Sequence, residues 1–273
     1  VLTGSDMKYE YSPDFPAHRL TTLMEWEDLV LPESTRISLR ELLAWPAHGS
    51  KLFGELDMGK NIQPGYRALF YGSSGTGKTL TASLIGKKAG KPVYRIDLSQ
   101  LVSKYIGETE KNLEKIFKTA ANRDWILFFD EADALFGKRT TIGSSNDRFA
   151  NQETAYLLQR IEVCENIIIL ASNVKANIDP AFSRRFQSVV YFPIPRAEER
   201  YELWKGVFTD KVILDDTIDL KQIAKDYDIT GGSIVNVVRY ACLMALSKNT
   251  VFITYDVFIE GLRREYAKLG RTL

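Results

Sequence analysis

The chain has 273 residues, a formal net charge of +1, and 45% hydrophobic and 26% charged residues. These values are ordinary for a globular protein with one large α/β domain and a smaller partner. The near-neutral charge gives no electrostatic reason to expect a nucleic-acid partner. No apolar run approaches the roughly 18 residues of a membrane span, and no signal peptide is visible, so we expect a cytoplasmic protein. Because the sequence begins with Val1, we expect a piece of a longer protein.

The first part of the chain shows no regular pattern. Residues 1–24 mix Tyr, Pro, Asp and Ser, which indicates an N-terminal arm or linker. Apolar spacing then predicts a helix across residues 37–43, followed by a loop at 46–49. We expect His18 and His48 to be surface loop residues rather than functional ones.

The most informative stretch is residues 72–79, Gly-Ser-Ser-Gly-Thr-Gly-Lys-Thr, which matches the phosphate-binding pattern G-x-x-x-x-G-K-[ST]. An apolar, strand-like run precedes it, and a helical spacing follows it as far as Gly90. Glycines allow backbone N–H groups to surround a phosphate chain, and the helix N-terminus favours negative charge. We expect Lys78 to contact the β- and γ-phosphates and Thr79 to bind Mg²⁺. A chance glycine-rich turn would not have both a strand before it and a helix after it.

Apolar runs indicate a parallel sheet, because strands covered on both faces read as continuous hydrophobic segments. The five expected strands cover residues 67–71, 92–97, 125–129, 166–171 and 188–192. Apolar spacing predicts a helix across 113–120. The polar, glycine-containing stretch 137–148 predicts a loop, and a further helix follows through 157–161.

Beyond residue 195 the pattern changes to helices only. Apolar residues recur at helical spacing in four segments, near 201–204, 220–227, 234–245 and 255–269. We therefore expect a large α/β domain across 25–195 and an all-α lid domain across 196–273.

Polar residues follow two of the expected strands. Asp130 and Glu131 stand where ligands bind in open α/β sheets, at a strand's carboxyl end. We assign Asp130 to Mg²⁺ and Glu131 to the attacking water. We expect Asn173 to sense the γ-phosphate or to orient that water. Read alone, an acidic strand end reflects solvent exposure, and an asparagine after a strand is a turn residue.

The dipeptide Arg184-Arg185 adds two cations after the fourth expected strand. An arginine that contacts the transferring phosphoryl group can raise the rate by about 10³–10⁵-fold. From the dipeptide alone, a solvated basic turn is the favoured interpretation.

Taken together, these residues resemble the AAA family of ATPases within AAA+, over roughly residues 25–268. The pattern is most similar to the katanin, spastin and fidgetin group and to the ATPases that dismantle endosomal filaments. The sequence of residues 127–139 resembles that of bacterial single-ring ATPases, some of which are encoded beside contractile injection systems. No H-E-x-x-H protease motif is present, and no arginine stands at the second sensor position of the lid.

The resemblance implies a P-loop αβα fold with a five-stranded parallel sheet of order 5-1-4-3-2, a helical lid, and ATP or ADP with Mg²⁺ as cofactors. It also implies a ring of identical subunits, usually hexameric, with ATP at the subunit interfaces. In such a ring Arg184 and Arg185 reach the ATP of a neighbour, and Asn173 is the first sensor.

The resemblance also assigns binding residues. It places adenine against Asp28, Leu29 and Val30, chiefly through their backbone, and brings Gly231 and Gly232 of the lid close to the nucleotide. The nucleotide-binding residues of the phosphate loop are Ser74, Gly75, Thr76, Gly77, Lys78, Thr79 and Leu80. The segment Lys104, Tyr105, Ile106 and Gly107 resembles the first pore loop, whose aromatic ring grips an extended polypeptide by shape and apolar contact.

The leading interpretation is therefore a ring ATPase that remodels, unfolds or disassembles a protein substrate through a central pore. The alternative is a nucleotide-controlled assembly or scaffold ATPase that threads no substrate. A small-molecule P-loop kinase is disfavoured by the paired carboxylates and the arginine dipeptide. A DNA-associated role is disfavoured by the near-neutral charge.

Overall fold

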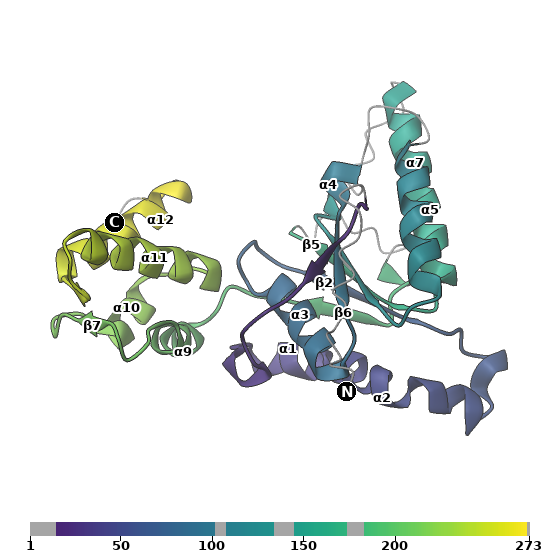
Figure 1. Cartoon of the computed structure of the whole chain (residues 1–273), viewed down its shortest axis with the longest axis horizontal. Helices are drawn as coiled ribbons and strands as arrows, with labels where there is room; N and C mark the ends of the chain where they lie inside the picture. The colour runs from purple at the N-terminus through teal and green to yellow at the C-terminus, as the bar shows by residue number, and fades with distance from the viewer. Residues whose placement is uncertain (1–14, 102–107, 134–144, 174–182, 272–273) are drawn as a thin grey trace, which may run out of the picture.

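The computed structural model describes residues 15–101, 108–133, 145–173 and 183–271. In these ranges a central sheet has helices on both faces, and a group of helices follows at the C-terminus (Figure 1). The α/β class with a mostly parallel sheet is thereby confirmed. No helix in these ranges combines the length and the apolarity needed to cross a membrane.

The main sheet has six strands in the order β1-β3-β4-β5-β2-β6. Their bounds are β1 (His18–Leu20), β2 (Tyr66–Tyr71), β3 (Val93–Asp97), β4 (Ile126–Asp130), β5 (Ile167–Ser172) and β6 (Ser188–Tyr191). The five strands from β2 to β6 are parallel, and taken in chain order they read 5-1-4-3-2 from the β6 edge. The sheet differs from the expected one by the additional strand β1.

Strand β1 lies within residues 1–24, where we expected an arm or linker and no strand. It pairs antiparallel with β3, with His18 opposite Arg95. Phe15 and Ala17 are buried beside it, and the Phe15 ring meets Trp125 edge-on at 6.3 Å between centroids. His18 is exposed, as expected, but it lies in a strand rather than a loop. Two apolar anchors thus attach a segment whose composition gave no strand signal.

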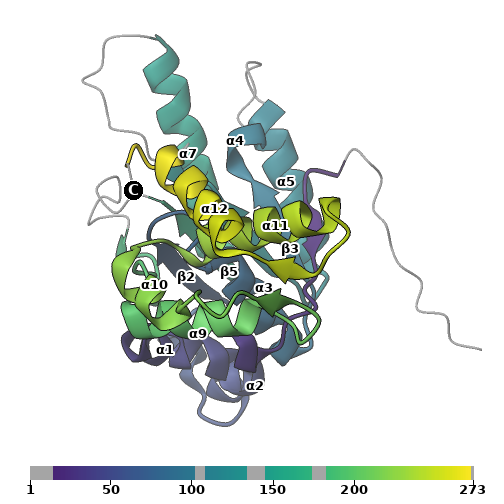
Figure 2. The same cartoon turned by 90° about the vertical axis from the view of Figure 1, so that its left-hand side faces the viewer.

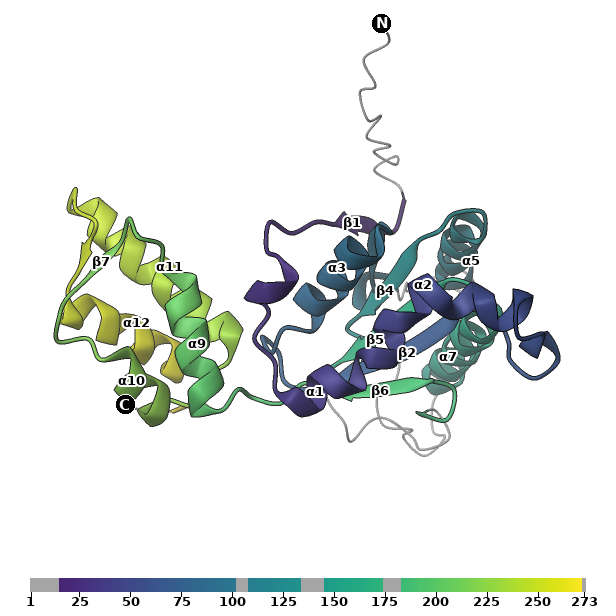
Figure 3. The ribbon, with the colours of Figure 1, turned by 90° about the horizontal axis from the view of Figure 1, so that it is seen from below.

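Two helical layers cover the sheet, as Figure 3 shows from below. Their bounds are α1 (Glu33–Ser38), α2 (Arg40–Gly54), α3 (Lys78–Ala89), α4 (Leu98–Leu101), α5 (Glu108–Ala121) and α7 (Ser145–Val163). Helices α5 and α7 share one apolar core with the sheet, while α2 and α3 share the core on the other face. The short 3₁₀ turns η1 (Trp26–Asp28) and η2 (Met58–Lys60) connect these elements.

Two helix boundaries differ from the sequence-based expectation. Helix α2 continues through Pro46, so the predicted loop with His48 is an exposed part of a helix. Packing outweighs the cost of an internal proline here, because Leu42 is fully buried and the Trp45 ring lies 5.3 Å from that of Tyr66. Helix α7 begins at Ser145, inside the stretch predicted as a loop.

The C-terminal helices have an apolar core of their own around Trp204 and Phe258. Their bounds are α9 (Ala197–Val207), α10 (Leu220–Asp226), α11 (Gly231–Ser247) and α12 (Tyr255–Lys268). They are not all-α as expected, because β7 (Ile213–Leu214) and β8 (Phe252–Ile253) form a short parallel pair. Figures 1 and 2 show this group beside the sheet, connected through the segment after β6.

Arg200 anchors the connection between the two regions. Its guanidinium donates to the carbonyl oxygens of Pro195 at 2.5 Å and Ala224 at 2.7 Å, and it pairs with Asp228 at 2.8 Å. The side chain is almost fully buried, so the three acceptors offset the cost of desolvating its charge. The connecting segment is therefore fixed to α9 and α10.

Candidate active site

The phosphate loop lies between the end of β2 and the first residue of α3, as the sequence predicted. Gly72, Gly75 and Gly77 all have positive φ angles, of 145°, 77° and 99°. At Gly75 space is limiting as well, since an added Cβ would lie 2.6 Å from the Thr230 hydroxyl oxygen. The loop can therefore turn its backbone inward only with glycine at these positions.

Lys78 is the buried cation of this loop. Its Nζ donates to the carbonyl oxygens of Gly72 at 2.6 Å and Ser73 at 2.9 Å, and to the Asn173 side-chain oxygen at 3.0 Å. Burial lowers the pKa of Lys78, and the nearby carboxylates of Asp130 and Asp133 oppose that shift. The contacts show that the end of β5 and the loop after β2 meet at one point.

Asp130 and Glu131 lie at the end of β4, on the same edge of the sheet. One oxygen of Asp130 accepts the Glu131 backbone N–H at 3.0 Å, and the other lies 3.0 Å from Arg95 Nε. Burial raises the pKa of the Asp130 carboxyl, while Arg95 acts in the opposite direction. Glu131 has a φ of 56°, a strained conformation for a residue with a Cβ.

Asn173 follows β5, and its backbone is hydrogen-bonded to the Asp133 side chain. The two carboxylate oxygens of Asp133 accept the Asn173 backbone N–H at 2.9 and 3.0 Å, and one of them also contacts the Ser172 hydroxyl. The sequence analysis did not assign Asp133 or Arg95. Asp133 could have been noticed as a third acid two residues after Glu131, and Arg95 as a charge between apolar strand residues.

One cavity of about 460 Å³ lies where these strand ends and the phosphate loop meet. Of the residues assigned from the sequence, its lining contains Asp28, Leu29, Val30, Ser74, Gly75, Thr76, Gly77, Lys78, Thr79, Leu80, Asp130, Glu131, Asn173, Gly231 and Gly232. Residues that the sequence analysis missed complete it: Met24, Leu31, Pro32, Arg95, Pro193, Pro195, Leu203 and Val235. Segments far apart in the chain therefore converge on this cavity.

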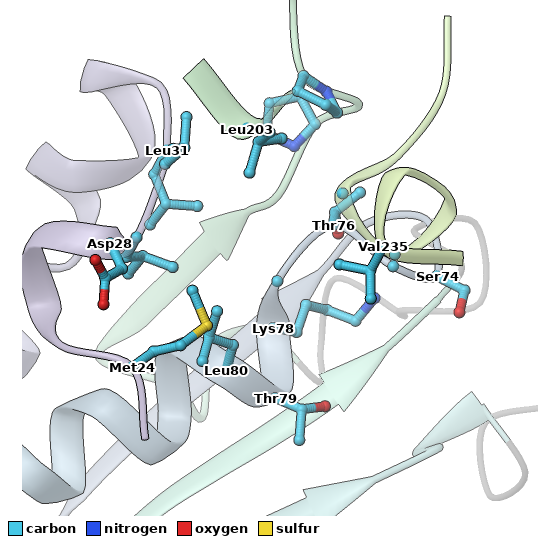
Figure 4. Close-up of a pocket in the computed structure, with 18 of the residues that line it drawn as sticks. Met24, Asp28, Leu31, Ser74, Thr76, Lys78, Thr79, Leu80, Leu203 and Val235 are labelled. Atoms are coloured by element: carbon cyan, nitrogen blue, oxygen red, sulfur yellow. The ribbon is translucent and has the colours of Figure 1, made fainter. Parts of the chain in front are cut away.

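The cavity has chemically different ends. Figure 4 shows Met24, Asp28 and Leu31 on one side, with Lys78 and Thr79 on α3 and Val235 facing them from the C-terminal helices. Arg36 donates to the carbonyl oxygens of Leu29 at 2.6 Å and Leu31 at 3.2 Å, which fixes this stretch of backbone. An apolar end with a rigid backbone suits a planar base, and the end with Lys78 suits phosphates.

The donors near Lys78 are of the kind that Mg²⁺ requires. Thr79 offers a hydroxyl oxygen and Asp130 a carboxylate oxygen, and both line the cavity. In the described ranges no cluster of three or more His, Cys, Asp and Glu side chains is arranged to hold a metal alone. Mg²⁺ normally takes one or two protein oxygens together with substrate phosphates and water, so this donor set fits it.

Two groups of assigned residues are not part of this cavity lining. Arg184 and Arg185 are exposed and do not line this cavity, and Arg185 pairs with Glu162. The predicted pore loop, Lys104, Tyr105, Ile106 and Gly107, lies outside the described residues.

Comparisons with known proteins point to one family. Residues 68–194 match the family model "ATPase family associated with various cellular activities (AAA)". The chain is 30% identical over 238 residues to a "Proteasome-activating nucleotidase" of Methanopyrus kandleri, covering 84% of this chain and 53% of that protein. It is 30% identical to a "Cell division cycle protein 48 homolog" of Archaeoglobus fulgidus, covering 90% of this chain and 32% of that protein.

A human relative extends the comparison. The chain is 32% identical to the human "ATPase family gene 2 protein homolog A", covering 83% of this chain and 26% of that protein. The chain thus spans about half the length of the nucleotidase and a third or less of the other two. The finer grouping with katanin, spastin and fidgetin stays a prediction. Residues 68–194, which contain the phosphate loop and the ends of β4 and β5, therefore form a domain of the AAA family of ATPases.

Proposed function

We propose that this chain hydrolyses ATP with Mg²⁺ in a ring of identical subunits, and that the ring remodels, unfolds or disassembles a protein substrate through its central pore. The observation that carries the proposal is the location of the charged residues, because some line the cavity and two arginines do not. Lys78, Asp130, Glu131 and Asn173 surround one cavity, while the Arg184-Arg185 pair is exposed outside it. A site whose last cation comes from a neighbour requires an oligomer.

Each residue at the cavity has a distinct task. Lys78 neutralises the β- and γ-phosphates, and the backbone N–H groups of the loop surround them. Thr79 and Asp130 would hold Mg²⁺, which when bound neutralises charge on the phosphate oxygens. Glu131 accepts a proton from the attacking water and orients it toward the γ-phosphate.

Asn173 would couple this chemistry to the rest of the sheet. Its side-chain oxygen accepts from Lys78, while its backbone is bound by Asp133. When phosphates replace the acceptors of Lys78, the Asn173 amide becomes available to the γ-phosphate or the water. The Asp133 contact keeps the amide in place during this exchange.

The arginine dipeptide supplies the remaining charge. Arg184 forms no ion pair with another described residue, whereas Arg185 is paired with Glu162 across a partly exposed contact. Arg184 is therefore the better placed of the two to reach a neighbouring subunit. A phosphoryl group in transfer gains from such a cation because charge develops on its oxygens.

Two relatives support a protein substrate by their names: one is a proteasome-activating nucleotidase, and one is a cell division cycle protein 48 homolog. We extend to this chain only the general idea of an ATP-driven action on a protein. The hexamer, the grip of Tyr105 on the substrate and the cytoplasmic location are parts of the proposal.

Mixing two inactive variants tests the shared site. Lys78→Ala removes the phosphate cation, and Arg184→Ala with Arg185→Ala removes the cations supplied to a neighbour. Each variant alone should lose most hydrolysis. A mixture should regain part of it, because some interfaces then combine an intact cavity with an intact arginine pair. ATP turnover is measured against the mixing ratio.

The outcomes separate the parts of the proposal. No recovery on mixing, with both variants folded and co-assembled, would refute a shared site. Tyr105→Ala then distinguishes threading from scaffolding: threading requires that a folded reporter substrate is no longer unfolded while hydrolysis continues. Unfolding that survives this change would remove the pore-loop assignment and leave the ATPase assignment unaffected.

A further inference from the structure

Arg95 is an unusual residue for its position. It lies in β3 between Tyr94 and Ile96, which are both buried, and its own side chain is 38% exposed. A charge in a strand covered by helices costs free energy unless it has a partner. The partner is Asp130 of the neighbouring strand β4, at 3.0 Å from Arg95 Nε.

The register of the sheet explains this contact. Arg95 is directly opposite Phe128, and Asp97 is opposite Asp130, so Arg95 and Asp130 are diagonal neighbours on the same face. A diagonal pair is within reach of a long side chain. The contact is therefore set by strand pairing, and it forms at the edge of the candidate ATP cavity, which both residues line.

Two cations stand on opposite sides of Asp130 in the sheet. Arg95 belongs to β3, whereas Lys78 follows β2, and β4 with Asp130 lies between these strands in the order β3-β4-β5-β2. Lys78 is bound to Gly72, Ser73 and Asn173, so Arg95 is the cation that contacts Asp130. Without Arg95, the attraction of Lys78 for Asp130 would be unopposed.

The contact also leaves room for adjustment. Arg95 Nε is buried and, among the described residues, finds no acceptor with the geometry of a hydrogen bond. Arg95 and Asp130 therefore form an ion pair at contact distance, but the N–H direction does not meet the geometry of a hydrogen bond. The other oxygen of Asp130 accepts the Glu131 backbone N–H, so two groups define the plane of the carboxylate.

We propose that Arg95 is a positioning residue for hydrolysis, which keeps the Asp130 carboxylate in the orientation that Mg²⁺ with ATP requires. The inference rests on the proposed role of Asp130 in the metal site. Partners that orient a metal-binding carboxylate typically change metal affinity or activity by about 10–100-fold when they are removed. A cation that merely competed with Mg²⁺ for Asp130 would have the opposite effect on the metal requirement.

The test is a Mg²⁺ titration of Arg95→Met, Arg95→Gln and Arg95→Lys in the full chain. Two quantities are followed: ATP turnover, and the binding of a fluorescent ADP analogue with Mg²⁺ and with the metal chelated. The two neutral variants should need about 10-fold more Mg²⁺ for half-maximal turnover and for the metal-dependent part of ADP binding. Arg95→Lys should restore most of the wild-type requirement, because it keeps the charge.

A matched control is Arg40→Met, which breaks an exposed ion pair with Glu33; neither residue lines the cavity, so this change should leave the Mg²⁺ requirement as it is. Two neutral variants are used so that one still gives a result if the other does not fold. Thermal melting identifies a variant that has not folded. In the background of Asp130→Asn, the change Arg95→Gln should add no further effect on the Mg²⁺ requirement, because Arg95 acts through that carboxylate.

Three results would overturn the proposal. A lower Mg²⁺ requirement in Arg95→Gln would show competition in place of positioning. An equal loss of ADP binding with the metal chelated would show that Arg95 binds phosphate directly. An unchanged Mg²⁺ requirement in Arg95→Gln would reduce Arg95 to a structural ion pair. If Asp130→Asn itself keeps the wild-type Mg²⁺ requirement, the role of Asp130 in the proposed function fails first.

Discussion

The sheet region and the C-terminal helices line the same cavity with different kinds of groups. The sheet region contributes charged and polar side chains: Asp130 and Asn173 at strand ends, and Lys78 at the start of α3. The C-terminal helices contribute Leu203, Val235 and two glycines. Residues able to transfer a proton or to hold a metal therefore come from the sheet, while the helices provide apolar walls and close backbone approach.

The two regions also differ in how they are held. Each has its own apolar core, and a direct link between them is the Gly232 backbone N–H, which donates to the Gly75 carbonyl oxygen at 3.0 Å. This link joins the phosphate loop to the start of α11. We expect changes in the sheet to affect the chemical step, and changes in the helices to affect affinity and closure.

The largest expected effect is on chemistry in the sheet. Glu131→Gln keeps the shape of the side chain but cannot accept a proton, so turnover should fall by about 10²–10⁴-fold. ATP binding, measured by equilibrium titration, should stay close to wild type. Glu55→Gln, at an exposed carboxylate beside α2, is the control. Normal turnover in Glu131→Gln would refute its role as the base.

The next effect is on stability in the C-terminal helices. Trp204 is fully buried there, and Trp204→Ala should cost about 3–5 kcal/mol, while Trp204→Phe should cost less because it keeps part of the volume. Hydrogen exchange should quicken in α9–α12 and change little in β2–β5. Uniform loss of protection in both regions would show that they unfold as one unit, contrary to the comparison.

A smaller effect is expected where the regions meet. A Cβ at Gly232 would lie 3.1 Å from Gly75 Cα, so Gly232→Val should push α11 away from the phosphate loop. ATP affinity should fall by about 10-fold, which corresponds to roughly 1.4 kcal/mol of binding free energy. The rate at which bound ATP is hydrolysed should change less. At Gly231 the nearest atom is 3.6 Å away, so Gly231→Ala should be milder. Equal losses in both variants would argue against a steric cause.

Sequence reasoning recovered the parts of this molecule that local patterns specify. The loop at 72–79 has fixed residues at fixed spacing, and the continuous apolar runs gave the five parallel strands within one or two residues. Strand β1 was missed because Phe15 and Ala17 become buried only against β3 and Trp125, which are distant in the chain.

The same reason explains what was missed at the site. The Arg95 contact with Asp130 depends on the register of two strands, which periodicity does not reveal. The wall formed by Leu203 and Val235 depends on how the C-terminal helices lie against the sheet. Pro46 is a local signal that tertiary packing overrode, since α2 continues to Gly54.

The smallest effect concerns backbone strain, and it too contrasts the two regions. Glu131, directly after β4 at the cavity, has a φ of 56°, and Asn249, in a turn after α11, has a φ of 55°. Glutamate is poorly suited to this conformation, whereas asparagine tolerates it. Glu131→Gly should therefore be about 1 kcal/mol more stable than Glu131→Ala, although both should lose turnover.

Chemical denaturation of the two Glu131 variants measures this difference, and Asn249→Gly compared with wild type is the matched control. The gain at Asn249 should be close to zero, because its strain is small and a glycine also loses more entropy on folding. A gain at Glu131 with none at Asn249 would mean that the sheet keeps an unfavourable backbone at the carboxylate proposed to act as the base. No difference between Glu131→Gly and Glu131→Ala would show that this backbone stores no free energy and that the side chain alone determines the role of Glu131.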